Sequence, residues 1–476
     1  MGPAWEPVPW TQPLAPQAQD TAIGGLRGVW EADSYPVREH IQTIQINEDV
    51  SIEARVLVPQ GAPGQTFPGL VMLHGAGTGL FTEAFTDLAP ALAEAGAVVV
   101  VPNKRLDTYS IRHRDYQDMA QDYEKSFDYL RSLPEVDPTQ TGLYCVSEGC
   151  YVGPVLASER TEVSFLIHVS APVVPGRWQA AFASDNYLRN TGVPTQVFRA
   201  IPRALGMAIP GGGFEYADFD VRPYFEQLDI PVMIVYGTDD LSVPVQQGPI
   251  EVITHLEAGG NTNWSVRYYE NADHGILVDG ELAQDFPSDM SAWIQNLPAS
   301  GGIYPKVAGG GVVQTFSAEE VPLPRWFGDG DSLVVVVIVA LVGMAFCLTV
   351  GLSNMIARRH RIFRPGVSGA VVSFSVFSVA TIVGLVAYLL AVAALAVNYE
   401  TDVRIVQWGW LGVRVLGVAA MFALALLIDH LQRIKKEHGR AMLRSPKAVI
   451  VSTIAILSGG LLILICTYWG VFQLGI

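Results

Sequence analysis

The chain has few residues that could hold a metal ion or form a disulfide framework. Its 476 residues include four cysteines, Cys145, Cys150, Cys347 and Cys466, with no CxxC pair and no zinc-like His/Cys spacing. We therefore expect neither a metal nor a cofactor. Cys145 and Cys150 flank one serine closely, and the sequence leaves open whether they form a disulfide. The other two lie in apolar runs, where cysteine packs as a small hydrophobic residue.

Positive charge is scarce in the first 330 residues. They contain 18 Lys and Arg against 41 Asp and Glu, whereas residues 331–476 contain 12 against 5, which gives net charges of −23 and +7. An acidic domain repels phosphate backbones, so we do not expect nucleic acid as a partner. Residues 1–20 also lack an apolar core flanked by basic residues, so they do not resemble a signal peptide.

Four long hydrophobic runs follow residue 331. Each is long enough to cross a bilayer, and four in succession indicate a transmembrane bundle surrounded by lipid rather than buried core helices. The predicted spans are residues 332–356, 370–397, 405–428 and 448–472. Arg414 lies inside the third span, where an arginine has either a functional role or a contact with a neighbouring helix or lipid.

The charges of the connecting loops predict the orientation of this bundle. The first loop, "ARRHRIFRP", carries four arginines and residues 430–447 carry six Lys or Arg, whereas "NYETDVR" carries one Arg against two acids. By the positive-inside rule the first and third loops are cytoplasmic, which places the acidic domain outside the cytoplasm. Export of such a domain requires a leader upstream of Met1; a cytoplasmic domain is the alternative.

The acidic part alternates strand-like and helix-like segments. Buried strands such as "FPGLVML" and "PVMIVYG" are separated by helical stretches such as residues 115–134. This alternation predicts an α/β fold with a mostly parallel sheet covered by helices on both faces. The predicted organisation is an N-terminal extension (1–39), an α/β domain (40–298), a Gly/Pro-rich linker (299–330) and a transmembrane domain (331–476).

Ser147 stands where a predicted strand ends and a helix begins. The segment Cys145-Val146-Ser147-Glu148-Gly149 is a variant of G-x-S-x-G, a sharp turn that exposes the serine hydroxyl and needs small residues on either side. Cysteine replaces the first glycine and is small enough to meet that need.

Partners for this serine follow later strands. Asp240, with Asp239 as the less favoured candidate, comes after "PVMIVYG", and His274 lies in the loop "ADHG". A serine needs a base and the base needs a carboxylate, and the order Ser, Asp, His is typical of this architecture. The backbone N–H groups of Ala76 and Glu148 are candidates for an oxyanion hole.

Taken together, "HGAG", "VPNKR", "CVSEG", "GTDDLSVP" and "ADHG" resemble the α/β-hydrolase superfamily, specifically dienelactone-hydrolase-like and prolyl-oligopeptidase-like esterases. The resemblance covers about residues 40–298. It implies Ser147 as nucleophile, His274 as general base, Asp240 as the acid, and Ala76 and Glu148 as oxyanion donors. It also places residues 172–228 where such enzymes carry a cap; this insertion is either a lid that contacts an acyl chain or a simple packing subdomain.

We therefore expect a membrane-anchored serine hydrolase that cleaves an ester or thioester, or transfers its acyl group. Its substrate would be ester- or lipid-like, with cell-envelope lipids as one class. The alternatives are a serine peptidase, an inactive fold acting as a binding or scaffold module for the bundle, and a bundle that works as a channel or lipid carrier with the hydrolase as sensor. The sequence gives no oligomeric state.

Overall fold

The computed structural model describes residues 7–23, 35–190, 195–198, 200–297, 303–324, 326, 328–356, 362–363, 366–397, 402–438 and 446–473. The chain divides into two compact units. We call them the sheet unit, which comprises Pro7–Ala183 and Gly213–Glu320, and the bundle unit, which includes Ser184–Gly212 and Val321–Ile476.

A nine-stranded sheet forms the centre of the sheet unit, in the order β1-β2-β4-β3-β5-β6-β7-β8-β11. β1 and β2 are antiparallel to their neighbours, and all pairs from β4 to β11 are parallel. The predicted α/β fold with a mostly parallel sheet is thus confirmed. The strands are β1 (Val37–Gln45), β2 (Ser51–Pro59), β3 (Phe67–Leu73), β4 (Val98–Pro102), β5 (Val136–Val146), β6 (Phe165–Val169), β7 (Val232–Gly237), β8 (Trp264–Tyr269) and β11 (Val307–Gly309).

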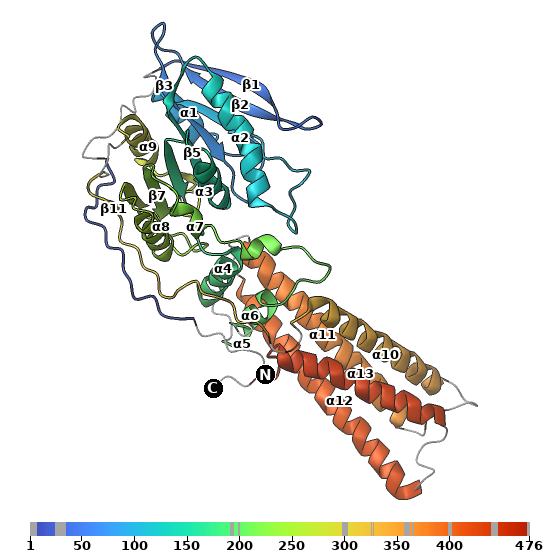
Figure 1. Ribbon diagram of the computed structural model, residues 1–476. Coiled ribbons are helices and arrows are strands. Elements are labelled where there is room, and N and C mark those ends of the chain that lie inside the picture. The colour runs from blue at the N-terminus through green and yellow to red at the C-terminus, as the bar shows by residue number, and fades with distance from the viewer. Residues whose placement is uncertain are drawn as a thin grey trace. The chain divides into compact units, whose positions relative to one another are not determined.

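Helices cover both faces of this sheet (Figure 1). Neighbouring strand residues point to opposite faces, so in β3 Val71 enters one hydrophobic cluster and Leu70 the other. The first cluster receives apolar side chains of α2, α3 and α8, and the second receives those of α1 and α9. These helices are α1 (Leu88–Glu94), α2 (Tyr116–Ser132), α3 (Gly149–Glu159), α8 (Gln247–Ala258) and α9 (Phe286–Gln295).

Two regions differ from the sequence-based predictions. β11 lies in the predicted linker, where Val307 pairs with Val266 of β8, so part of that segment belongs to the sheet rather than to a tether. A three-residue strand in a Gly-rich stretch is too short to show alternation. The chain also forms a short hairpin of β9 (Leu277–Val278) and β10 (Glu281–Leu282) after the His274 loop.

The segment predicted as a cap contains several short elements. They are α4 (Gly176–Asn190), α5 (Thr195–Phe198), α6 (Ala200–Leu205), the 3₁₀ helix η1 (Glu215–Asp218) and α7 (Arg222–Phe225). Residues 184–212 of this segment group with the bundle unit and not with the sheet. The predicted insertion is therefore shared between the two units.

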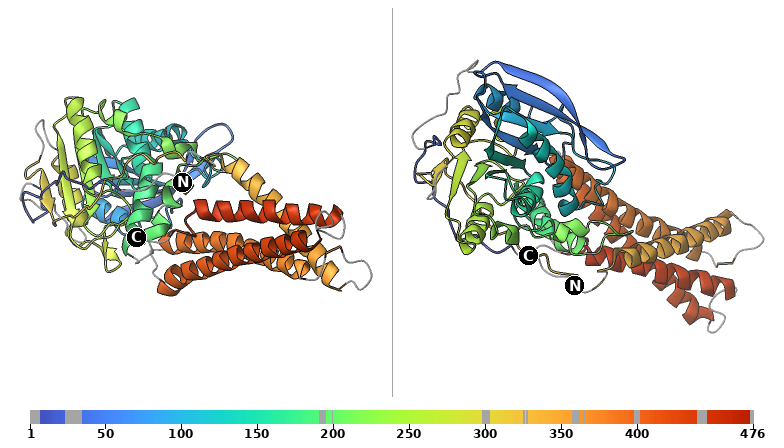
Figure 2. Two further views of the ribbon diagram at one scale, coloured as in Figure 1. Left: turned by 90° about the horizontal axis from the view of Figure 1, so that it is seen from below. Right: turned by 45° about the horizontal axis from the view of Figure 1, so that its top comes forward.

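The bundle unit contains four helices that are long and apolar enough to cross a membrane, in agreement with the four predicted spans. Figure 2 shows them running side by side. They are α10 (Gly330–Ile356), α11 (Val367–Val397), α12 (Gly409–His438, preceded by a π-helical turn, Arg404–Trp408) and α13 (Pro446–Tyr468). Small residues allow close packing, since a Cβ at Gly343 would collide with Ser458 and one at Gly459 with Phe374.

Two arginines bind carbonyl groups at the C-terminal end of α13. Arg414 Nη2 donates to the Gln473 carbonyl at 3.2 Å, and Arg203, from α6, donates to the Tyr468 carbonyl. Tyr468 is the last residue of α13, where a cation is favoured because the last carbonyls of a helix lack partners, whereas Gln473 lies five residues beyond the helix. Arg414 of α12 thus contacts the segment that follows α13, and its role stays a prediction. The arginines of the first charged loop lie outside the described residues, as do residues 439–445 of the third.

Candidate active site

Ser147 occupies a tight turn between β5 and α3. Its φ is +53°, in the left-handed region that residues other than glycine rarely adopt. The Ser147 N–H donates to the Val169 carbonyl at 2.9 Å, and the Ser147 carbonyl accepts from the Cys150 N–H at 3.0 Å. Such strain persists only where the surroundings fix it, and here it holds the hydroxyl out of the line of both elements.

The residues around this turn must be small because the chain passes close to β3. A Cβ at Gly149 would lie 2.7 Å from the Leu73 carbonyl oxygen and 2.9 Å from that of His74. On the other side, a Cβ at Gly153 would lie 3.1 Å from Cys145 Sγ. The cysteine in place of the first glycine therefore fits only because α3 presents a glycine opposite it.

Gly149→Ala is expected to destabilise the sheet unit by about 1–3 kcal/mol, the usual cost of overpacking, because its Cβ meets backbone atoms that cannot rotate away. Thermal unfolding of the full-length protein in detergent would measure the effect. Gly311→Ala is the matched control, since nothing lies within 4 Å of its Cβ. Equal melting temperatures for the two variants would contradict this description of the turn.

Asp240 and His274 lie beyond the carboxyl ends of β7 and β8. Asp240 is buried, and its Oδ1 accepts from the Ser242 N–H at 2.8 Å. The His274 loop is closed by Asp273, whose Oδ1 accepts from the N–H groups of Gly275 at 2.7 Å and Leu277 at 3.0 Å. Parallel strands end at the same edge of the sheet, which is why residues far apart in sequence meet there.

The structure brings Ser147, His274 and Asp240 into one hydrogen-bonded chain. His274 Nδ1 lies 2.8 Å from Asp240 Oδ2, and His274 Nε2 lies 2.9 Å from Ser147 Oγ. An ionised carboxylate only accepts, so the proton is placed on Nδ1 and Nε2 presents its lone pair to the serine hydroxyl. Asp239, the other candidate acid, is exposed and donates its backbone N–H to the Ala272 carbonyl.

Burial and charge act in opposite directions on His274. Burial lowers the pKa of the imidazole, but the charge and hydrogen bond of Asp240 outweigh it, so the pKa is raised above its usual value. The His274 side chain remains 28% exposed, whereas that of Asp240 is fully buried. The imidazole can therefore reach a substrate while the carboxylate cannot.

The two predicted oxyanion donors lie on either side of Ser147. Ala76 is exposed in the loop after β3, and a Cβ on the adjacent Gly75 would lie 3.2 Å from Ser147 Cβ. Glu148 is the N-cap residue of α3. Within the described part of the chain, neither of these two backbone N–H groups donates to a protein acceptor.

The neighbouring His74 has a structural role. It is buried, and its Nε2 lies 2.7 Å from the Pro102 carbonyl oxygen while its Nδ1 lies 3.4 Å from Thr78 Oγ1. Burial lowers the pKa of His74 to about 4, so the ring is neutral and holds the loop in place.

The Glu148 side chain has contacts that the sequence did not reveal. Although it points away from solvent, its carboxylate binds Lys104 Nζ at 3.1 Å, Tyr109 Oη at 2.7 Å, Tyr116 Oη at 3.4 Å, and Arg114. We call these five residues the Glu148 network. Lys104 belongs to the "VPNKR" segment, but nothing in its spacing indicates a contact with residue 148.

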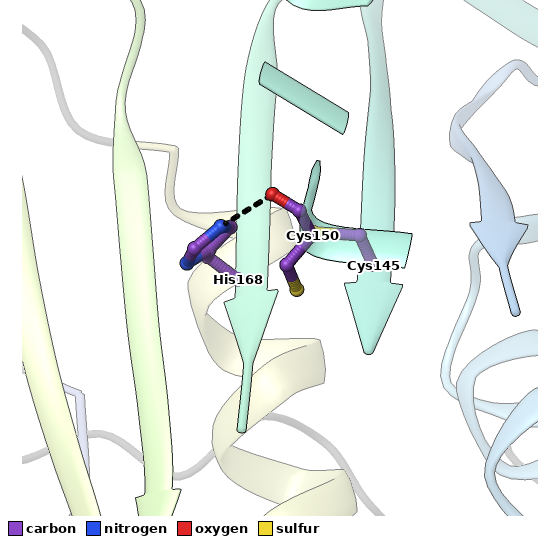
Figure 3. Close-up of side chains that lie close together, drawn as sticks. All are labelled: Cys145, Cys150 and His168. Atoms are coloured by element: carbon purple, nitrogen blue, oxygen red, sulfur yellow. Dashed lines mark hydrogen bonds between the residues drawn. The ribbon is translucent and has the colours of Figure 1, made fainter. Parts of the chain in front are cut away.

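Cys145, Cys150 and His168 form a second buried group beside α3 (Figure 3). Their possible metal-ligating atoms lie within 4.8 Å of one another, and all four cysteines of the chain are free thiols. His168 Nε2, however, lies 3.2 Å from the Cys150 carbonyl oxygen. In a regular helix that carbonyl would bind the N–H of residue 154, but residue 154 is a proline.

His168 therefore replaces a hydrogen bond that Pro154 cannot make. Burial lowers the pKa of His168 to about 4 and raises the pKa of the Cys150 thiol. Metal binding requires thiolates and a free imidazole nitrogen. Burial favours the neutral Cys150 thiol, and His168 Nε2 is engaged, whereas His168 Nδ1 has no hydrogen-bond partner within the described ranges. The thiols of Cys145 and Cys150 donate to the Ile167 and Val169 carbonyls, each at 3.5 Å, so the group links β5 and α3 to β6.

Part of this chain is similar to a known protein family. Residues 121–278, about a third of the chain, match the family described as "BAAT / Acyl-CoA thioester hydrolase C terminal". No curated protein matches the chain in sequence.

Solved structures similar to this chain include three hydrolases. Dienelactone hydrolase from Anabaena variabilis is 15% identical, with a TM-score of 0.38 over 55% of this chain and 99% of that one. Acylaminoacyl peptidase from Pyrococcus horikoshii is 14% identical, with a TM-score of 0.38 over 55% of this chain and 40% of that one. Dipeptidyl peptidase 4 from Porphyromonas gingivalis is 17% identical, with a TM-score of 0.40 over 56% of this chain and 36% of that one. This chain thus spans well under half the length of both peptidases.

The identity of the fold follows from the sheet order, the strand–turn–helix at Ser147 and the loops that follow β7 and β8. The chain contains a domain of the α/β-hydrolase fold, together with four candidate membrane-spanning helices.

Proposed function

We propose that the chain is a membrane-anchored serine hydrolase acting on carboxylic esters or thioesters. The observation that carries the proposal is the hydrogen-bonded chain from Ser147 through His274 to the buried Asp240. A serine hydroxyl becomes an effective nucleophile only when a base accepts its proton and a third group orients that base. The match to an acyl-CoA thioester hydrolase family supports acyl chemistry of this kind.

In the proposed reaction, Ser147 Oγ attacks the carbonyl carbon while His274 Nε2 takes the hydroxyl proton. The oxyanion of the tetrahedral intermediate faces the N–H groups of Ala76 and Glu148. His274 then gives the proton to the departing alcohol or thiol, leaving an acyl-enzyme on Ser147. Water, activated by the same imidazole, releases the acid; a second alcohol in place of water would accept the acyl group.

A lipid-like substrate is supported by the organisation of the chain. Residues 184–212 interrupt the α/β fold where related enzymes carry a cap, yet they group with the four apolar helices. An ester drawn from membrane lipid would suit an enzyme whose insertion belongs to its membrane unit. The extracytoplasmic location of the domain remains a prediction, and a C-terminal reporter active only outside the cytoplasm would test it.

Substrate class can be tested with the full-length protein in detergent. p-Nitrophenyl esters, an acyl-CoA and an aminoacyl p-nitroanilide would be compared for wild type and Ser147→Ala. We expect the esters or the thioester to be hydrolysed by wild type alone. Cleavage of the anilide without the esters would indicate a peptidase, and hydrolysis by both proteins would contradict the role of Ser147.

A further inference from the structure

We propose that Lys104 is a positioning residue for the oxyanion hole, because its ammonium group joins the two chain segments that carry the N–H donors. This inference rests on the proposed function and extends it to a residue outside the Ser147–His274–Asp240 chain. Lys104 lies two residues beyond β4, and its side chain is only 1% exposed. Its Nζ donates to the Gly75 carbonyl at 2.6 Å and to Glu148 Oε2 at 3.1 Å.

The first of these contacts acts on Ala76. The Gly75 carbonyl and the Ala76 N–H belong to the same planar peptide group, so fixing one fixes the direction of the other. A cation at the carbonyl oxygen also draws electron density from the amide, which strengthens its N–H as a hydrogen-bond donor. Lys104 thus orients and polarises the Ala76 donor without touching the substrate.

The second contact acts on Glu148, the other donor residue. Its side chain is held by Lys104, Arg114 and the hydroxyls of Tyr109 and Tyr116, so residue 148 cannot rotate about its backbone without breaking several hydrogen bonds. Tyr109 Oη also lies 3.4 Å from the Ala76 carbonyl oxygen. The Glu148 network therefore contacts both donor segments at once.

The charge of the network suits this role. Two cations, Lys104 and Arg114, face a single carboxylate, and Lys104 Nζ and the Arg114 guanidinium both lie over the Tyr109 ring, at 4.3 and 4.9 Å from its centroid. This excess positive charge contacts the Gly75 carbonyl and the Glu148 side chain, which adjoin the two N–H groups expected to face the developing negative charge. A fixed, dry positive charge lowers the energy of that oxyanion at no cost of reorganisation.

A purely structural ion pair would have a different signature. Burying charged groups is costly, so loss of Lys104 could reduce the folded population without changing the site in the molecules that fold. The readout must therefore count active sites and report on the oxyanion itself. A trifluoromethyl ketone, which forms a tetrahedral adduct with serine and places an oxyanion in the hole, provides such a report.

The experiment compares Lys104→Met, Tyr109→Phe and wild type, all full length in detergent, with Arg160→Met as the matched control. Arg160 is the C-cap residue of α3, whereas Glu148 is its N-cap residue. Arg160 pairs with Glu124, Asp128 and Glu162. Active sites are counted by fluorophosphonate labelling. Ester kcat/KM is then calculated per labelled site, and the inhibition constant of the trifluoromethyl ketone is measured on the same samples.

We expect Lys104→Met to lower kcat/KM by about 10²-fold, comparable to the loss of one oxyanion donor. The inhibition constant of the trifluoromethyl ketone should rise by a similar factor. Tyr109→Phe keeps the charges and should weaken both by a smaller factor, about 3- to 10-fold, the net worth of a typical hydrogen bond. Arg160→Met should change neither. Tyr109 is only half-buried, so this variant remains informative if Lys104→Met does not fold.

Unchanged kcat/KM and ketone inhibition in labelled Lys104→Met would overturn the inference while leaving the proposed function intact. The same conclusion would follow from an unchanged Tyr109→Phe if the lysine variant does not fold. A wild-type protein that is neither labelled nor active on esters would overturn the proposed function, and the inference with it.

Discussion

His274→Ala is expected to reduce ester hydrolysis by about 10⁴-fold or more, the loss seen when a residue of such a unit is removed. The reason is geometric: His274 Nε2 is the group that faces Ser147 Oγ, at 2.9 Å, and no second base contacts that hydroxyl among the described residues. The measurement is kcat/KM for a p-nitrophenyl ester, with folding checked by thermal unfolding.

His255→Ala provides the matched control for this variant. His255 carries the same side chain on α8, where its Nδ1 lies 2.7 Å from Glu226 Oε1. Its removal should leave kcat/KM unchanged within about twofold, as is usual for surface substitutions. Retention of more than about a tenth of the wild-type activity by His274→Ala would mean that another group takes the serine proton, contrary to general-base catalysis by this imidazole.

Asp240→Asn is expected to lower kcat/KM by about 10³- to 10⁴-fold at neutral pH. An asparagine amide can donate to His274 Nδ1, which favours the tautomer with the proton on Nε2 and leaves no lone pair for Ser147. The carboxylate also raises the pKa of His274, so in wild type activity should fall as the pH drops through that raised value and the base becomes protonated.

Without the Asp240 carboxylate the pKa of His274 should be lower. The residual activity of Asp240→Asn should therefore fall on acidification at a lower pH than the activity of wild type does. Asp239→Asn is the matched control, because Asp239 is the adjacent acid but is exposed. It should keep the rate and the pH profile of wild type. A large loss in Asp239→Asn with little change in Asp240→Asn would reverse the assignment of the acid.

Much of the fold could be predicted from the sequence because its signals are local. The central strands are continuous apolar runs, and the four apolar helices of the bundle unit are longer still, so each can be recognised without knowledge of its neighbours. β11 and the β9–β10 hairpin could not be predicted in this way. They are two or three residues long, and β11 exists only because Val307–Gly309 can extend the edge formed by β8.

The candidate site was predictable to a similar extent and for a similar reason. Ser147, Asp240 and His274 stand directly after strands, and parallel strands bring such positions to one edge. Lys104 also follows a strand, but its importance lies in a contact with the Gly75 carbonyl, a backbone atom that has no sequence signature. The role of His168 depends likewise on a carbonyl left without a partner by Pro154.

The most direct test of the central claim is covalent labelling of the full-length protein by a tagged fluorophosphonate, which reacts with activated serines. Membranes carrying wild type and Ser147→Ala would be compared, with Ser170→Ala as a second serine variant. We predict labelling of wild type and Ser170→Ala, and none of Ser147→Ala. Labelling that persists in Ser147→Ala, or that is absent from folded wild type, would contradict an activated nucleophile at Ser147.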